Sequence, residues 1–283
     1  MTDDVYRRSV VACRSFEIAP GLGRRRLELP TGYVTVVFGF AGPVGLTPVG
    51  RPMPVTASAS LVGGVDARAV IGSHVGGLCG IEVSLRPTVA SRILALPMAE
   101  LAGRFADPGR LLGVDMAEFE ARLAACGTWR ERRAHIEVLL ARRWQQGRAC
   151  PPEIERAWQL LHAGRRESVE AVARDVGWDR RRLARRFQEF VGLSARDVIQ
   201  VARLQRALRL EADGVPLTAV AHRAGYHDQA HLNHVFADVV GMSPGAFRRA
   251  AGASRTLFGA QDRIPGFITS VLMPQSNTLT EVR

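Results

Sequence analysis

Two sets of side chains suited to contacting nucleic-acid bases recur in the last third of this chain. Arginine binds guanine edges or phosphates, and amide and imidazole groups hydrogen-bond other base edges, so such sets on an exposed helix face can read a major groove of DNA. The first set comprises Arg180, Arg181, Arg182, Arg185 and Gln188, and the second comprises Gln229, Ala230, His231, Asn233 and His234.

Each set lies inside one copy of a degenerate repeat. The first copy reads Ala-x-x-x-Gly-Trp at 173–178 and closes with Gly-Leu-Ser at 192–194. The second reads Ala-x-x-x-Gly-Tyr at 221–226 and closes with Gly-Met-Ser at 241–243. A small residue lets two helices approach closely, and glycine adopts the backbone of a tight turn. The repeat therefore predicts two helix-turn-helix units.

The second helix of the first unit has one apolar and one basic face. Leu183, Phe187 and Phe190 follow helical spacing, and the Arg-rich set lies on the opposite side of the helix. A charged face of this kind is often only solvated. The preceding Ala-x-x-x-Gly turn favours the DNA-reading alternative here, and Asp179 is expected to cap the helix.

The second unit repeats this arrangement with less charge. Asp228 is the expected cap, and Leu232 and Phe236 face the core. The outward face is polar but carries fewer positive charges, so we expect the first unit to contribute more affinity. The spacing of His227, His231 and His234 also resembles a metal site, but a DNA-reading face already explains it, and no metal is predicted.

A long helix over 196–213 is expected to join the two units and fix their separation. Adjacent major grooves on one face of DNA lie about 34 Å apart. Residues 153–249 then resemble the DNA-binding domain of the AraC/XylS family of bacterial transcription regulators. Three stretches carry the resemblance: Leu-Ala-Arg-Arg-Phe at 183–187, Arg-Leu-Gln-Arg-Ala at 203–207, and the segment from Gly-Tyr-His-Asp-Gln at 225–229 to Gly-Met-Ser-Pro at 241–244. The resemblance implies that Arg185 contacts a base. His234 stands where the family commonly has arginine.

The N-terminal third reads as a β-rich domain. Apolar and β-branched residues alternate over 27–62 and 67–85, with Gly and Pro turns between them. This pattern predicts a small barrel or sandwich. Leu29-Pro30-Thr31-Gly32 and the stretch 77–101 resemble the sensor half of family members, which implies a cupin-like barrel that binds an effector or dimerises. A metal enzyme on the barrel would need several converging ligands, but His74 is the lone histidine of residues 27–87. We therefore predict no enzyme, no catalytic residue and no cofactor.

The composition indicates a protein with a polyanionic partner, but it does not show which region binds that partner. The 283 residues carry a net charge of +11, and all 38 basic residues are arginine. A positive balance favours a polyanionic partner, although high genomic G+C content also enriches arginine. Residues 151–250 hold 16 arginines against 12 acidic residues, and residues 1–150 hold 19 against 13. The net charge of each segment therefore does not identify which half of the chain binds DNA.

The sequence predicts a cytoplasmic protein. Four separated cysteines, Cys13, Cys79, Cys126 and Cys150, match neither a zinc knuckle nor a disulfide framework and are interpreted as reduced thiols. The acidic N-terminus lacks the apolar segment of a signal peptide, and the most apolar run, 34–40, is too short to span a membrane.

The predicted fold is α+β in four parts. Residues 1–87 form the cupin-like sensor, 88–150 a helical support or dimerisation segment, 151–252 an all-α double helix-turn-helix domain, and 253–283 an irregular tail. In the segment 129–146, Ile136, Leu139, Leu140 and Trp144 form an apolar stripe. The favoured interpretation packs this stripe on the sensor, and the alternative pairs it with a second copy.

The leading hypothesis is an effector-controlled transcription regulator, either activator or repressor. Its predicted partner is double-stranded DNA, with a small-molecule effector, RNA polymerase and a homodimer partner as further candidates. The alternative is a ligand-binding or interaction module whose C-terminal domain contacts protein instead.

Overall fold

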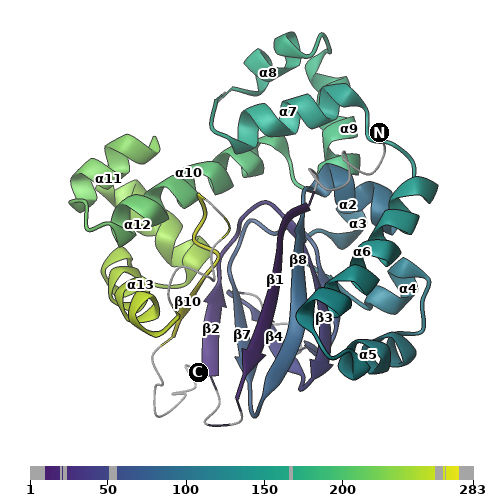
Figure 1. Cartoon of the computed structure of the whole chain (residues 1–283). Helices are drawn as coiled ribbons and strands as arrows, with labels where there is room; N and C mark the ends of the chain where they lie inside the picture. Colours follow the sequence, from purple (N-terminus) through teal and green to yellow (C-terminus); the bar gives the residue numbers. More distant parts are fainter. Residues whose placement is uncertain are drawn as a thin grey trace.

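The computed structural model describes residues 10–19, 21, 24–50, 56–165, 168–258, 264 and 266–273. Two five-stranded antiparallel sheets form the N-terminal part (Figure 1). The first has the order β1 (Val10–Ile18), β8 (Leu78–Leu85), β3 (Val34–Ala41), β6 (Leu61–Gly63), β9 (Phe105–Ala106). The second has the order β10 (Ser270–Leu272), β2 (Arg24–Glu28), β7 (Val70–His74), β4 (Val44–Pro48), β5 (Thr56–Ser58).

The β-rich prediction is confirmed, but the closed cupin-like barrel is wrong. Within the described residues, no strand pairing joins the two sheets, so they form an open sandwich. Three of the strands nearest the edges, β5, β6 and β9, have only two or three residues each. Such short strands offer few hydrogen bonds with which to extend a sheet to closure.

One face of the first sheet is covered by helices. Val34, Val36 and Phe38 of β3 point to this face and are fully buried, because successive strand residues alternate sides. The covering helices are α2 (Pro87–Leu94), α3 (Met98–Leu101), α4 (Pro108–Leu112), α5 (Met116–Ala125) and α6 (Trp129–Gln146). All five helices begin within or next to the predicted helical segment 88–150, and α6 has the bounds of the predicted stripe segment, 129–146.

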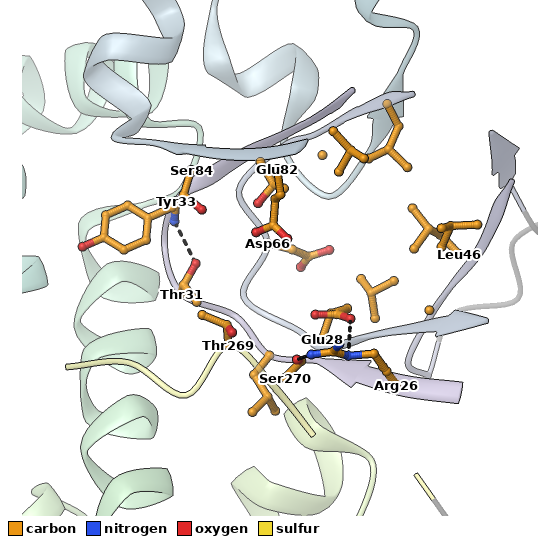
Figure 2. Close-up of a pocket in the computed structure, with 18 of the residues that line it drawn as sticks. Arg26, Glu28, Thr31, Tyr33, Leu46, Asp66, Glu82, Ser84, Thr269 and Ser270 are labelled. Atoms are coloured by element: carbon orange, nitrogen blue, oxygen red, sulfur yellow. Dashed lines mark hydrogen bonds and ion pairs between the residues drawn. The ribbon is translucent and has the colours of Figure 1, made fainter. Parts of the chain in front are cut away.

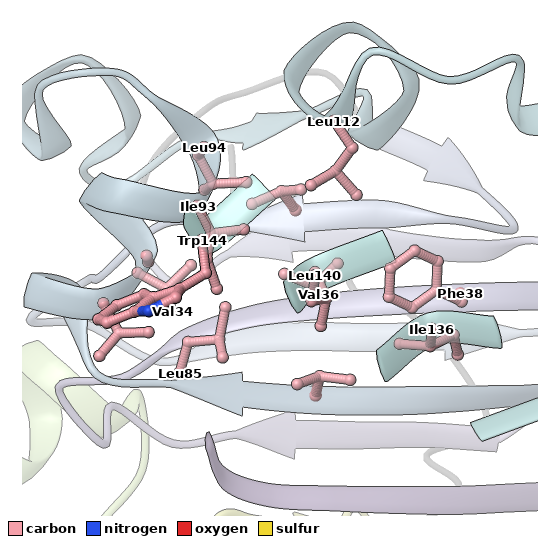
Figure 3. Close-up of a cluster of buried hydrophobic side chains, with 14 of the residues drawn as sticks. Val34, Val36, Phe38, Leu85, Ile93, Leu94, Leu112, Ile136, Leu140 and Trp144 are labelled. Atoms are coloured by element: carbon pink, nitrogen blue, oxygen red, sulfur yellow. The ribbon is translucent and has the colours of Figure 1, made fainter. Parts of the chain in front are cut away.

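Helix α6 lies along the sheet with its apolar stripe inward (Figure 3). A capping box starts the helix: the Thr128 hydroxyl accepts from the Glu131 N–H, and the Glu131 carboxylate accepts from the Thr128 N–H. Ile136, Leu140 and Trp144 are buried against β3 and α2 in the same hydrophobic cluster. The prediction that this stripe packs on the sensor is confirmed.

The C-terminal half is helical. Its elements are α7 (Pro152–His162), α8 (Val169–Asp175), α9 (Arg180–Val191), α10 (Ala195–Ala212), α11 (Leu217–Ala224), α12 (Gln229–Val235), the π-helical turn η1 (Phe236–Val240) and α13 (Pro244–Phe258). Within the described chain, no helix has the length and apolar character required to cross a membrane.

Both helix-turn-helix units pack on the β-rich part. In the first unit, α9 contacts α2 and α3. In the second, Phe236 and Phe247 share a buried cluster with Leu27 and Leu29 of the second sheet. The Ala69 N–H also donates to the Val239 carbonyl across 2.8 Å. The two halves of the chain therefore share hydrophobic cores.

The expectation of an irregular tail is wrong for its described part. Helix α13 continues through Phe258, and residues 270–272 form β10, which pairs antiparallel with β2 (Figure 1). The remaining tail residues, 259–263, 265 and 274–283, lie outside the described residues. Strand β10 has only three residues, and its partner is remote in sequence, so no local pattern announces it.

Candidate DNA-binding surface and ligand cavity

The turn of each helix-turn-helix unit has the same hydrogen bonds. In the first, the Trp178 N–H donates to Ala173 O (3.0 Å) and the Gly177 N–H to Arg174 O (3.1 Å). In the second, the Tyr226 N–H donates to Ala221 O (2.9 Å) and the Gly225 N–H to His222 O (3.2 Å). Both are Schellman motifs, which require a left-handed residue, and the two glycines have φ of +70° and +83°. The sequence repeat is thus a structural repeat.

The second helix of unit one is fixed by its cap and its core. The Asp179 carboxylate accepts from the Arg182 N–H across 2.8 Å, as predicted. This and weaker backbone hydrogen bonds lower the pKa of Asp179. Leu183 and Phe187 are fully buried. The opposite face is thereby directed to solvent, and Arg181, Arg185 and Gln188 are all exposed on it.

The other two arginines of the first set have partners within their own unit. Arg180 forms an ion pair with Glu170 of α8 at 3.1 Å. The Arg182 guanidinium lies over the Trp178 ring, 4.3 Å from its centroid. Within the described residues, no ion pair engages Arg181 or Arg185. Arg181 and Arg185 are therefore exposed guanidinium groups of this face that no described ion pair occupies.

Unit two presents its polar face in the same way. The Asp228 carboxylate caps α12 by accepting from the His231 N–H at 2.7 Å, which lowers the pKa of Asp228. Leu232 is fully buried. The other four residues of the second set, Gln229, Ala230, Asn233 and His234, are all exposed.

Two of the three histidines with metal-like spacing have other contacts. His227 pairs with Asp228 at 3.0 Å between Nδ1 and a carboxylate oxygen. His231 lies edge-on to Tyr226, with ring centroids 5.4 Å apart. Among the described residues, no group of three or more His, Cys, Asp or Glu side chains is placed to hold a metal ion.

Helix α10 joins the two units and contains a buried polar residue that the sequence patterns above do not single out. Val201, Leu204 and Leu208 of α10 are buried, and Gln205 among them is only 1% exposed. A glutamine inside an apolar stripe is a readable signal for a buried hydrogen-bond network, because a buried amide needs partners. In this helix the apolar positions 201, 204 and 208 and the glutamine at 205 form that pattern.

A cavity of about 260 Å³ lies between the two sheets (Figure 2). It is lined by the strand faces opposite the helical layer, including Thr35, Glu82 and Ser84 of the first sheet and Arg26 and Glu28 of the second. The three buried apolar clusters of the described chain are centred elsewhere. The space between the sheets, where a sandwich normally has its core, is thus an open chamber lined by both apolar and charged side chains.

Charged groups in the chamber are mostly paired. Arg14 Nη2 lies 2.7 Å from Glu82 Oε1, and Arg26 Nε lies 3.6 Å from Glu28 Oε1. The carboxylates of Glu28, Asp66 and Glu82 point toward the same space (Figure 2). Buried charge pairs cost desolvation energy and contribute little net stability. Their placement around a cavity favours a role in binding.

His74 lies in the chamber wall. Its side chain is buried, and Nδ1 lies 3.0 Å from the Gly76 carbonyl oxygen. Because a carbonyl only accepts, Nδ1 is the donor in this hydrogen bond. Within the described residues, Nε2 is buried without a hydrogen-bond partner.

The cysteines show no sign of activation. Burial raises the pKa of the Cys13 and Cys79 thiols, and it raises the pKa of Cys150 to about 12. A raised pKa disfavours the thiolate, which is the reactive form.

Sequence comparison agrees with the paired turns. The profile of a helix-turn-helix domain family matches residues 172–250. A protein from Streptomyces antibioticus described as an AraC-like transcription regulator is 32% identical over 109 residues, which are 38% of this chain.

The C-terminal region is an AraC-type helix-turn-helix domain. The match covers 36% of the Streptomyces protein, so the chain aligns with about a third of that relative's length.

Two groups of solved structures are also similar. The C-terminal domain of AraT, a response regulator from Geobacillus stearothermophilus, is 24% identical, with 35% of this chain and 86% of that chain covered and a TM-score of 0.33. ToxT from Vibrio cholerae is 9% identical over 85% of this chain and 98% of its own, with a TM-score of 0.46. The assignment of the AraC-type domain rests on the sequence match and the two turns.

Proposed function

We propose that the protein is a cytoplasmic, sequence-specific transcription regulator whose AraC-type domain reads two successive major grooves of DNA. The supporting observation is the pair of identical turns, each followed by a capped helix with a buried apolar face and an exposed polar face. In this proposal Arg181, Arg185 and Gln188 contact one groove, and Asn233 and His234 contact the next.

The two units contribute unequally to binding in this proposal. Unit one presents exposed guanidinium groups, which bind phosphate or guanine through charge-assisted hydrogen bonds. The exposed face of unit two offers amide and imidazole groups instead. Unit one therefore supplies most of the salt-dependent affinity, and unit two refines sequence choice.

The proposal is tested by footprinting the full-length protein on the DNA that flanks its own gene, at increasing salt concentration. Two protected patches about 34 Å apart along the duplex are expected. Counterion release predicts that protection weakens steeply with salt. Diffuse protection without discrete patches, or affinity insensitive to salt, would favour the alternative of a protein-interaction module.

Substitution of Arg185 by alanine tests the assigned face. We expect Arg185→Ala to weaken operator binding by about 1–3 kcal/mol and to relax preference at one base position, because a bidentate base contact is lost. Arg122→Ala is the control, since Arg122 is an exposed arginine on α5, paired with Glu118 and distant in sequence from both units. Equal operator affinity of Arg185→Ala and Arg122→Ala in gel-shift titrations would show that the face is misassigned.

We further propose that the chamber binds the effector and that it serves recognition and not catalysis. The carboxylates of Glu28, Asp66 and Glu82 face it beside apolar side chains such as Val37 and Leu46, which suits a small molecule that combines hydroxyl or amino donors with an apolar part. Thermal-shift screening with amino alcohols and diols that carry an alkyl group tests this class. A hit should stabilise the wild type and not the Glu82→Gln variant, which lacks one of the acceptor charges.

A further inference from the structure

Gln205 makes three hydrogen bonds that tie α10 to two distant segments. Its Nε2 donates to Pro30 O (2.8 Å) and to Ile268 O (3.1 Å), and its Oε1 accepts from the Ile268 N–H (3.0 Å). The amide thus holds the backbone of Ile268 as a neighbouring strand would. The backbone N–H and carbonyl of Ile268 both hydrogen-bond to this side chain of α10, the helix that joins the two DNA-binding units.

The residues after Ile268 form part of the chamber wall. Thr269 and Ser270 line the chamber, and they point toward it in Figure 2. Arg14 Nη1 donates to the Thr269 hydroxyl (3.4 Å), and the Arg26 guanidinium donates to the Ser270 hydroxyl. These are the arginines that also pair with Glu82 and Glu28. A ligand that binds those charges therefore changes the partners of the tail.

The same segment reaches the first helix of the DNA-binding half. Phe267 stacks on His162 of α7, with ring centroids 5.1 Å apart, and meets Tyr33 edge-on at 5.4 Å. His162 Nε2 lies 2.7 Å from the Thr31 carbonyl oxygen. We call Ile264 and residues 266–273 the strap, since they contact the chamber, α7 and α10 together.

We propose that the strap couples occupancy of the chamber to the position of α10, and so to the placement of the two DNA-reading units. The inference rests on the proposed function and names the regulation of that same site. Coupling requires an element with two arrangements whose balance both sites change. The strap is the element in a position to do this, because it contacts both sites and β10 is an edge strand of only three residues.

Three amides report directly on the strap. The Leu29 N–H donates to Thr269 O (2.8 Å), the Met273 N–H donates to Arg25 O (3.0 Å), and the Ile268 N–H donates to Gln205. Hydrogen exchange of peptides that contain these amides measures how often the strap opens. We would measure it in the full-length protein alone, with operator DNA, and with random DNA of equal length.

Coupling between two binding sites is reciprocal, so operator binding must alter the strap if the strap alters operator binding. Operator DNA should change the exchange rate of the three amides by at least about fivefold, which is the lower range of allosteric coupling, and random DNA should not. Gln205→Leu should abolish this response, because it removes the link between α10 and Ile268. Gln200→Leu is the matched control, since Gln200 is an exposed glutamine of the same helix.

The chamber side is tested with a substitution that takes the place of a ligand. Val37 of β3 lines the chamber, so Val37→Phe fills part of it and acts as a built-in occupant. We expect Val37→Phe to change strap exchange in the Gln200→Leu background and to shift operator affinity only while Gln205 is present. Gln205→Asn, which keeps an amide but shortens the side chain by one methylene, is the milder variant if Gln205→Leu does not fold.

The outcomes separate the two proposals. Discrete operator footprints with unchanged strap exchange would overturn the coupling and leave the proposed function intact. Absence of any specific footprint would overturn the proposed function, while the response of the strap to Val37→Phe would still show whether chamber and strap are linked. Unchanged strap exchange in Val37→Phe would overturn the inference by itself.

Discussion

At the scale of single residues, two glycines with similar backbone angles have different roles. Gly177, in the turn of unit one, has φ of +70°, and a Cβ added there would point into open space. Gly192, which ends α9, has φ of +85°, and a Cβ there would lie 2.7 Å from Met98 O and 3.0 Å from Val65 Cγ2. Gly192 therefore serves both the helix end and the contact between unit one and the β-rich part.

Alanine substitution separates those roles. Gly177→Ala should cost about 1–2 kcal/mol of unfolding free energy, the strain of a left-handed alanine. Gly192→Ala should cost more, because the strain is joined by a clash with the Met98 backbone. Urea denaturation of both variants measures the difference, and equal losses would show that the contact between α9 and α3 yields without cost.

His162 gives a second residue-scale prediction, a dependence of stability on pH. Burial lowers the pKa of His162 from its ordinary value of 6.5, although the hydrogen bond to Thr31 O opposes the shift. Below about pH 6.5 the unfolded chain binds a proton that the folded chain excludes, so stability falls with pH until the folded pKa is reached. Wild type should lose more stability than His162→Phe between about pH 7.5 and about pH 5.5. Urea midpoints at both pH values provide the measurement, and parallel losses would contradict the assignment.

At the scale of elements, α10 and α13 are joined by a charge pair that is half buried. Glu211 of α10 is 1% exposed, and both its oxygens accept from Arg248 of α13 at 3.0 Å. Arg248 also donates to Val215 O. The partly exposed guanidinium thereby neutralises a carboxylate that water does not reach, so the pair fixes the last helix of unit two on the joining helix.

Removal of the arginine should leave that carboxylate uncompensated. We expect Arg248→Leu to lower the free energy of unfolding by about 2–3 kcal/mol. Arg249→Leu, at the exposed neighbouring position, should change it by no more than about 0.5 kcal/mol. Comparison of the two variants by urea denaturation controls for loss of charge and of helix propensity; matching stabilities would mean that Glu211 is solvated or protonated.

At the scale of the whole molecule, the sandwich and the DNA-binding half share a core. Leu27 of β2 is fully buried in the cluster that contains Phe236, Phe247 and Val271. We therefore expect Leu27→Ala, a change in the β-rich part, to destabilise unit two by about 2–5 kcal/mol. Hydrogen exchange of α11 and α12 should report the loss. Faster exchange confined to the two sheets would contradict a shared core.

The sequence was most informative where structure is local. Asp179 and Asp228 were identified as caps, and Gly177 and Gly225 as turn residues, because each acts on atoms a few positions away. The α6 stripe was interpreted correctly for the same reason, since helical spacing alone defines its face.

Features that join remote segments were missed or misread. The alternation of β3 indicated a two-faced strand, but not that one face meets helices and the other an open chamber. The open sandwich and the pairing of β10 with β2 depend on contacts between segments far apart in the chain. Which of the surface residues of α9 and α12 contact bases stays a prediction.

The pairing of β10 with β2 also has a consequence for biosynthesis. Strand β2 leaves the ribosome long before β10, because Arg26 and Ser270 on the paired strands are 244 positions apart. A nascent chain, or one terminated before β10, therefore presents an open strand edge, which invites aggregation and proteolysis. Only a chain translated through β10 can cover this edge of β2. Shorter chains would keep the edge open and be removed, so β10 would restrict the accumulated protein to chains that contain it.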